Sequence, residues 1–243
     1  MRALATLLCV LAACAPGEAP ELDAAHRYAT DPTLPKEEGA RVDGVPHGPW
    51  LTRHDNGVVA ERGEYRRGVR IGDWTTWHPN SVAASRGRYE NGRQSGTWRT
   101  WHRSGHLHEV GDYVDDLCTG EWVEHHENGE VLARGPYEAG LQQGTWTYFE
   151  SDGTRVMQGD FDAGQRTGAW RRWHADGTLA LESRFENGVE HGPSQAWHAD
   201  GTLAFEGAYA AGELDGPCRF WGTDGALDET ASGTYRAGVH VGD

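Results

Sequence analysis

Lysine is almost absent from this sequence of 243 residues, because Lys36 is the only one and every other cationic side chain is an arginine. Acidic residues outnumber basic ones by 37 to 22, which gives a formal net charge of −15. Nucleic-acid binding depends on neutralised phosphates, and docking on anionic lipid depends on a basic patch. The charge balance therefore argues against both kinds of partner.

Apolar residues are also scarce, at 37 % of the chain, whereas there are 34 glycines and 11 tryptophans. This composition favours short strands, many turns and aromatic packing, and it leaves little material for helices. The chain has no G-x-S-x-G elbow, no phosphate-binding loop and no H-E-x-x-H motif. We therefore expect a protein that is not an enzyme and needs no cofactor.

One pattern recurs eight times with a period of 24 residues. Each copy begins at a glycine and reads G-x-W-x-x-W-H-x-D/N-G, followed after five residues by G-x-Y/F-x-x-G-x-x-x-G. The starting glycines are Gly48, Gly72, Gly96, Gly120, Gly144, Gly168, Gly192 and Gly216, and the last copy has two extra residues after Gly225. A fixed period of this size is typical of a stacked repeat array, in which each unit packs on its neighbours.

Each copy carries the signals of a β-hairpin. In the sixth copy the runs Trp170–His174 and Thr178–Phe185 flank an Asp-Gly pair, and Asp/Asn-Gly between alternating segments is a strong hairpin signal. A second glycine-containing turn then leads to the next hairpin, its glycines supplying positive φ angles.

Two registers are open for this hairpin. A three-residue loop, which we favour, sets Trp173 opposite Leu179 and places both on one face of the sheet with Leu181 and Phe185. A two-residue turn would instead set Trp170 opposite Ser183, where other copies have glycine.

The N-terminus reads as a lipoprotein signal peptide at residues 1–13. Arg2 precedes an apolar run that is too short to span a bilayer, and Leu11-Ala12-Ala13-Cys14 resembles the lipobox of bacterial lipoproteins. The resemblance implies lipid attachment to Cys14 and an anchored protein in the cell envelope. Because no aspartate follows the cysteine, it also implies the outer membrane in a Gram-negative cell. The alternative is an ordinary signal peptide cut near Ala15.

Residues 14–38 are rich in proline and acidic side chains and lack periodicity, so we expect a flexible tether. Residues 39–47 repeat only the later glycines of a copy and are predicted to be a half-repeat cap. The array of eight repeats then occupies residues 48–243.

The 24-residue pattern resembles the MORN repeat (membrane occupation and recognition nexus), in the variant found in bacterial tandem arrays. The carriers are the recurring G-x-W, D/N-G and G-x-Y-x-x-G elements, and the match extends from Gly39 to Asp243. The resemblance implies an all-β protein, an elongated single-layer array of antiparallel hairpins that rises about 10 Å per repeat.

Several copies depart from the pattern. Ser194 and Cys218 replace the first tryptophan, and His125 replaces the second aromatic residue in copy four. Asp116 and Ser81 stand where other copies have a turn glycine. No cap follows the last copy, so its edge strand is a candidate for self-association.

Histidine occupies one repeat position in six copies, at His54, His78, His102, His126, His174 and His198. Equivalent residues should lie about 10 Å apart, which is too far for two ligands of one zinc ion. The weak candidates for a metal site are therefore local: His102, His106 and His108. The favoured interpretation is that the histidines pack beside the turns, half-exposed.

The aromatic side chains serve either the core, which we favour, or a binding surface. As a surface, Trp77, Trp101, Trp173 and Trp197 could stack on sugar rings or grip a peptide. Cys118 and Cys218 are about four repeats apart, roughly 40 Å of rod, so they should not form a disulfide.

The leading hypothesis is a non-catalytic, lipid-anchored scaffold of the cell envelope that binds a protein or another envelope component through its β-surface. Some bacterial proteins with this repeat variant are described as antitoxins, so the second hypothesis is an acidic inhibitor of a toxin partner. A third is a carbohydrate-binding surface protein.

Overall fold

The structure, a computed structural model, describes residues 33–242, and within this range it contains strands and turns but no helix. The strands are β1 (Glu37–Val42), β2 (Val45–Arg53), β3 (Val59–Arg66), β4 (Val69–Trp77), β5 (Ala83–Glu90), β6 (Arg93–Trp101), β7 (Leu107–Val114), β8 (Leu117–His125), β9 (Val131–Glu138), β10 (Leu141–Gln142), β11 (Gly144–Phe149), β12 (Arg155–Asp162), β13 (Gln165–Trp173), β14 (Leu179–Glu186), β15 (Val189–Trp197), β16 (Leu203–Ala210), β17 (Glu213–Leu214), β18 (Gly216–Phe220), β19 (Gly233–Arg236) and β20 (Val239–Gly242).

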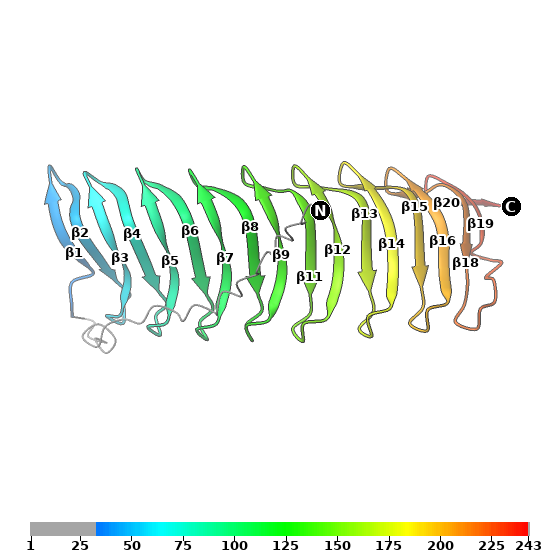
Figure 1. Cartoon of the computed structure of the whole chain (residues 1–243), viewed down its shortest axis with the longest axis horizontal. Coiled ribbons are helices and arrows are strands. Elements are labelled where there is room, and N and C mark those ends of the chain that lie inside the picture. The colour runs from blue at the N-terminus through cyan, green and yellow to red at the C-terminus, as the bar shows by residue number, and fades with distance from the viewer. Residues whose placement is uncertain (1–32, 243) are drawn as a thin grey trace, which may run out of the picture.

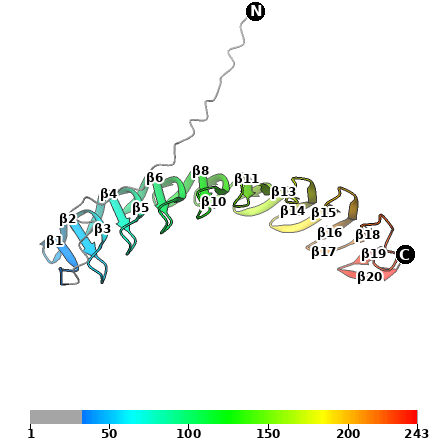
Figure 2. The same cartoon turned by 90° about the horizontal axis from the view of Figure 1, so that it is seen from below.

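Each strand pairs antiparallel with its neighbours in sequence, so the chain forms one open sheet without crossovers. The short β10 and β17 continue into β11 and β18, and each pair of pieces faces a single neighbouring strand. Figure 1 shows the hairpins side by side along a rod, and Figure 2 shows that the rod is curved along its length. The predicted single-layer, all-β hairpin array is confirmed.

Two kinds of turn alternate along the edges of the sheet. At the Asp/Asn-Gly turn of copy six, Gly177 adopts a φ of +84° and its N–H donates to the carbonyl of His174. The second turn joins β14 to β15 through Asn187 and Gly188, with φ angles of +51° and +82°. Two successive positive φ angles match a type I′ turn, which suits the twist of adjacent strands.

A bulge in the hairpins of copies one to seven reconciles the two registers left open by the sequence. Trp173 pairs with Leu179 beside the turn, but Arg172 pairs with Leu181 and Trp170 with Ser183 further along. The extra residue on β14 shifts the register by one between these points. The prediction that Trp173 and Leu179 share a face with Leu181 and Phe185 is therefore wrong, because Leu181 and Phe185 lie on the face of Trp170.

The first tryptophan of each repeat packs on one face of the sheet, which we call the aromatic face. Its members are Trp50, Trp74, Trp98, Trp122, Trp146 and Trp170, all buried. They alternate with tyrosine and phenylalanine rings in edge-to-face contacts, as in Tyr113–Trp122 at 5.1 Å and Trp122–Tyr137 at 5.7 Å between centroids. Such contacts add to the stability gained from burial and link every repeat to the next.

Each of these indoles covers a glycine of the preceding repeat. A Cβ placed on Gly111 would lie 2.1 Å from the indole of Trp122, and the same holds for Gly159 and Trp170 at 2.2 Å. At copy seven the tryptophan is replaced by Ser194, and the residue beneath it is Ser183 rather than glycine. The two buried hydroxyls hydrogen-bond at 2.7 Å. The two departures from the pattern are thus one coupled substitution.

The second aromatic row packs beside the Asp/Asn-Gly turns. Trp77 and Trp101 form a buried cluster with Val58, Val59 and Ala83 near the N-terminal end of the rod. In copy four the row is occupied by His125, whose Nδ1 is buried and has no hydrogen-bond partner in the described structure. Burial lowers the pKa of this histidine.

The described array begins at β1, whose strand starts at Glu37, inside the stretch predicted as a tether. Its residues Ala40–Val42 pair with β2, as the half-repeat cap requires. At the other end, β20 pairs with β19 and has Val239 and Val241 exposed. The two extra residues of the last copy lie in the loop before β19, where Asp228 accepts hydrogen bonds from two backbone N–H groups.

Candidate binding surface

A central row of side chains runs along the aromatic face, beside the first tryptophans, with one residue from each of the longer strands from β1 to β18. From the pairing it comprises Glu37, Thr52, Glu61, Thr76, Ser85, Thr100, Glu109, Glu124, Ala133, Tyr148, Met157, Arg172, Leu181, Ala196, Phe205 and Phe220. The row is polar as far as Glu124 and, apart from Arg172, apolar or aromatic from Ala133 onward. The aromatic face therefore offers a polar half and an apolar half.

A cleft of about 250 Å³ opens in the polar half, over β5 to β8. Its walls include Tyr89, Trp98, Tyr113 and Trp122, and its polar groups include Gln94 and Glu109. The two indoles are mostly buried in the sheet packing, each 7 % exposed, and they form walls of the cleft.

Two carboxylates face each other at the edge of this cleft. Glu109 on β7 pairs directly with Glu124 on β8, and both side chains are half-buried. Like charges directly opposite each other on neighbouring strands are destabilising. The nearest cationic candidate is His108, 3.7 Å from Glu124, and no arginine or lysine of residues 33–242 forms an ion pair with either carboxylate.

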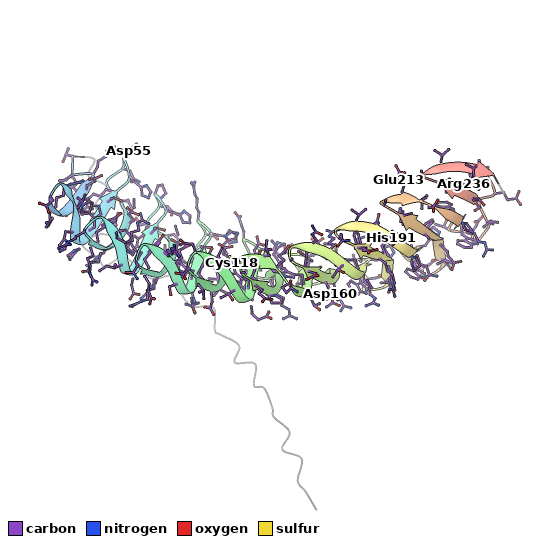
Figure 3. The ribbon with its side chains drawn as sticks, turned by 90° about the horizontal axis from the view of Figure 1, so that it is seen from above. Asp55, Cys118, Asp160, His191, Glu213 and Arg236 are labelled. Atoms are coloured by element: carbon purple, nitrogen blue, oxygen red, sulfur yellow. The ribbon has the colours of Figure 1, made fainter. Side chains whose placement is uncertain are left out.

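The phenol and thiol groups around Glu109 are held in their neutral forms. Burial raises the pKa of Tyr113, and the neighbouring Cys118 and Glu109 raise it further. Burial likewise raises the pKa of Cys118 and of Tyr137. Cys118 lies midway along the rod in Figure 3, and both it and Cys218 are free thiols, as predicted. Nothing in this environment activates the thiol as a nucleophile.

The six histidines that share one repeat position, which we call the histidine file, have a structural role. Nε2 of His126 lies 3.0 Å from the carbonyl oxygen of Phe149 in the next repeat, and the other five file members make the same contact with the residue 23 positions ahead. Because a carbonyl only accepts, the ring nitrogen donates. Each half-buried imidazole therefore ties one turn to the next repeat, in agreement with the favoured interpretation.

The weak metal candidates do not come together as a group of three. The rings of His102 and His108 lie 4.5 Å apart between centroids, but Nδ1 of His106 bonds the Glu127 carbonyl at 2.5 Å. Within residues 33–242 no three His, Cys, Asp or Glu side chains are arranged to hold a metal ion.

The four tryptophans proposed as an aromatic surface do not form one. Trp77 and Trp101 are buried in the turn cluster, 7 % and 4 % exposed. Trp173 and Trp197 are half-buried, and the guanidinium of Arg155 lies 3.8 Å from the centroid of the Trp173 ring. Stacking on sugars would therefore have to displace side chains from at least part of this row.

The lipid-attachment residue Cys14 and the signal peptide lie outside the described residues. In the part that the structure describes, no helix has the length and apolar character needed to cross a membrane.

Comparison with known proteins agrees with the repeat assignment. Residues 119–139 match the family model of the MORN repeat variant. The same 24-residue pattern, folded as the same hairpin, recurs in every copy, which supports a MORN-repeat protein. No curated protein matches the chain.

Among solved structures, the chain is similar to part of one titled "Crystal Structure of TcdB2-TccC3". The identity is 8 % and the TM-score 0.20, over 78 % of this chain. The chain spans only 13 % of the length of that protein, and the low score carries no argument about function.

Neither the cleft nor the pairing of Glu109 with Glu124 was predicted from the sequence. A signal was available, because Glu61 and Glu109 are the only acidic residues at their position within the eight copies. Their face of the sheet could not be assigned from the sequence, because the bulge shifts the alternation of side chains by one residue.

Proposed function

We propose that this protein is a non-catalytic binding scaffold that holds a protein partner on its aromatic face, while a lipid on Cys14 tethers it in the cell envelope. The observation that carries the binding proposal is the central row, whose polar half contains a cleft and whose other half is apolar. Interfaces commonly combine an apolar core with polar contacts that set specificity. The repeat supports a binding protein as its general class.

Charge supports a protein partner with a basic segment. The chain carries a net charge of −15, and neither Glu109 in the cleft nor Glu124 opposite it forms an ion pair with an arginine or lysine of the described array. Complementary charge speeds encounter and disfavours acidic competitors. The same property would suit an antitoxin-like inhibitor of a basic toxin, which stays the second candidate.

A carbohydrate ligand is less well supported, because the tryptophans proposed for stacking are buried or half-buried. Fluorescence quenching of Trp173 and Trp197 by a neutral quencher tests this candidate. Protection of both indoles would remove the stacking surface that it requires. Self-association through β20 stays a separate proposal, based on its exposed edge.

The tether is tested by intact-mass spectrometry of the mature protein after cell fractionation, beside a Cys14→Ser control. We expect a membrane-bound species that begins at a diacylated Cys14 and disappears in the control. A soluble species that retains Met1 would contradict the envelope proposal and move the antitoxin-like inhibitor to first place.

A further inference from the structure

The array contains its own example of a guanidinium group bound on the aromatic face. Arg70, at the end of copy one, extends over the face so that its guanidinium carbon lies 4.2 Å from the centroid of the Trp74 ring in copy two. Its Nη2 donates to Glu61 at 2.7 Å, and its Nε and Nη1 donate to the hydroxyls of Tyr65 and Tyr89 at 3.3 Å each. This is a complete guanidinium site, with one carboxylate, one indole and two phenols.

The energetics of Arg70 show that the site is favourable for a cation. Burial alone would lower the pKa of this arginine, but the two tyrosine hydrogen bonds and the charge of Glu61 raise it above its usual value. Arg166, at the same repeat position, stacks on Trp170 at 4.4 Å even though Met157 there replaces the carboxylate. The aromatic face thus accepts a guanidinium group from this repeat position twice.

Two repeats after the Arg70 site, every partner residue recurs but the arginine does not. The residues 48 positions after Glu61, Tyr65, Trp74 and Tyr89 are of the same types. They form a second site, whose members are Glu109, Tyr113, Trp122 and Tyr137. At the position of Arg70 this second site has Cys118, a much shorter and neutral side chain. The carboxylate is present without its cation.

The geometry around this second site fits an incoming side chain. Tyr113 and Tyr137 flank the Trp122 ring edge-on, as Tyr65 and Tyr89 flank Trp74. Glu109 and Trp122 both border the cleft of about 250 Å³. Glu124, directly opposite Glu109, adds a second negative charge that the Arg70 site does not have.

We infer that Glu109, Tyr113, Trp122 and Tyr137, the first three of which border this cleft, form a receptor site for an arginine side chain of the partner protein. The guanidinium group takes the place that Arg70 occupies two repeats earlier, stacked on Trp122 and paired with Glu109. This inference rests on the proposed function and specifies the chemistry that the partner must present. Arginine is preferred over lysine, because its planar fork can stack on the indole while donating to several oxygens.

The test measures the dissociation constant of a fluorescent N-acetylated tetra-arginine amide by polarisation, using the full chain at low salt. We expect Glu109→Gln and Cys118→Arg each to raise Kd at least tenfold, a loss of about 1.4 kcal/mol. Glu109→Gln removes the carboxylate, and Cys118→Arg fills the site from within. Cys118→Arg should fold, since Arg70 and Arg166 occupy the equivalent position in other copies.

Two matched controls exclude general charge and loss of the thiol. Glu61→Gln changes the net charge as Glu109→Gln does, but its site is already filled by Arg70, so Kd should stay unchanged. Cys118→Ala should also leave Kd unchanged. A tetra-lysine amide should bind more weakly than its arginine counterpart.

The inference is overturned if Glu61→Gln weakens binding as much as Glu109→Gln, if Cys118→Arg leaves Kd unchanged, or if the lysine peptide binds equally well. Thermal unfolding of each variant shows whether a loss reflects misfolding. Failure here leaves the proposed function standing if the aromatic face still cross-links to a protein in cells. Absence of that cross-link contradicts the proposed function itself.

Discussion

At the scale of single residues, the array is specified by pairs of side chains that must change together. An indole lies on the glycine of the preceding repeat in copies one to six, and a Cβ there would overlap the ring. At copy seven, Ser183 and Ser194 replace the glycine and the tryptophan, and their hydroxyl groups hydrogen-bond to each other. Both Ser183 and Ser194 are evident in the sequence as exceptions to the repeat pattern. That they contact each other follows only from the pairing of β14 with β15.

A double-mutant cycle tests this coupling. We expect Ser194→Trp alone to lower the free energy of unfolding by about 2 kcal/mol, since the indole would overlap the Cβ of Ser183. Adding Ser183→Gly should recover the loss, because it recreates the arrangement of Gly159 beneath Trp170. Urea unfolding of the four proteins gives the coupling energy. Strictly additive effects would show that the two positions do not interact.

Acid should destabilise the array through His125. Burial lowers its folded-state pKa, so between that value and the unfolded value of about 6.5 the unfolded chain binds more protons. Stability is therefore lost as the pH falls through this window. His125→Phe, which copies Phe149 at the same position, should gain stability over the natural protein as the pH drops from about 7.5 to 5.5. Parallel stability–pH curves for the two proteins would contradict this account.

At the scale of the hairpin, the sequence allowed prediction of strands, turns and repeat boundaries, but not of faces. The Asp/Asn-Gly signals located each loop, and the opposition of Trp173 and Leu179 was correct beside the turn. One extra residue on the return strand then moved Leu181 and Phe185 to the other face. A bulge leaves no distinctive residue type in this pattern, so the period alone could not reveal it.

Turn chemistry supplies a prediction at this scale. Ser81 has a φ of +68° at a position where most other copies have glycine, and this backbone conformation is unfavourable for a residue with a Cβ. Ser81→Gly should raise the free energy of unfolding by about 1 kcal/mol. The reciprocal Gly105→Ser should lower the free energy of unfolding by a similar amount. A Cβ on Gly105 would lie 3.8 Å from Val82 without a clash, so the loss would come from the positive φ angle alone. If Ser81→Gly proves destabilising in chemical unfolding, the strain assigned to this turn is absent.

At the scale of the whole molecule, we propose that this rod of similar units binds its partner where the repetition breaks. The regular positions maintain packing: indoles cover glycines, and imidazoles tie turns to the following repeat. The cleft shares Glu109, Tyr113 and Trp122 with the site at which Cys118 replaces the arginine of the Arg70 site, and Glu109 pairs there with Glu124. The sequence predicted the rod from its period. Among the aromatic candidates, Trp77 and Trp101 are buried, whereas Trp173 and Trp197 are half-buried.

The use of the aromatic face is tested most directly by site-specific photo-cross-linking in cells, with a benzophenone amino acid at either Thr100 or Thr97. Both residues lie on β6 of the same hairpin. Thr100 pairs with Glu109 on the aromatic face, whereas Thr97 pairs with Asp112 on the opposite face. We predict a protein adduct from Thr100 that is weak or absent from Thr97, and that is lost on adding Glu109→Gln. An adduct from Thr97 alone, or equal adducts from both, would contradict the assignment of the binding surface.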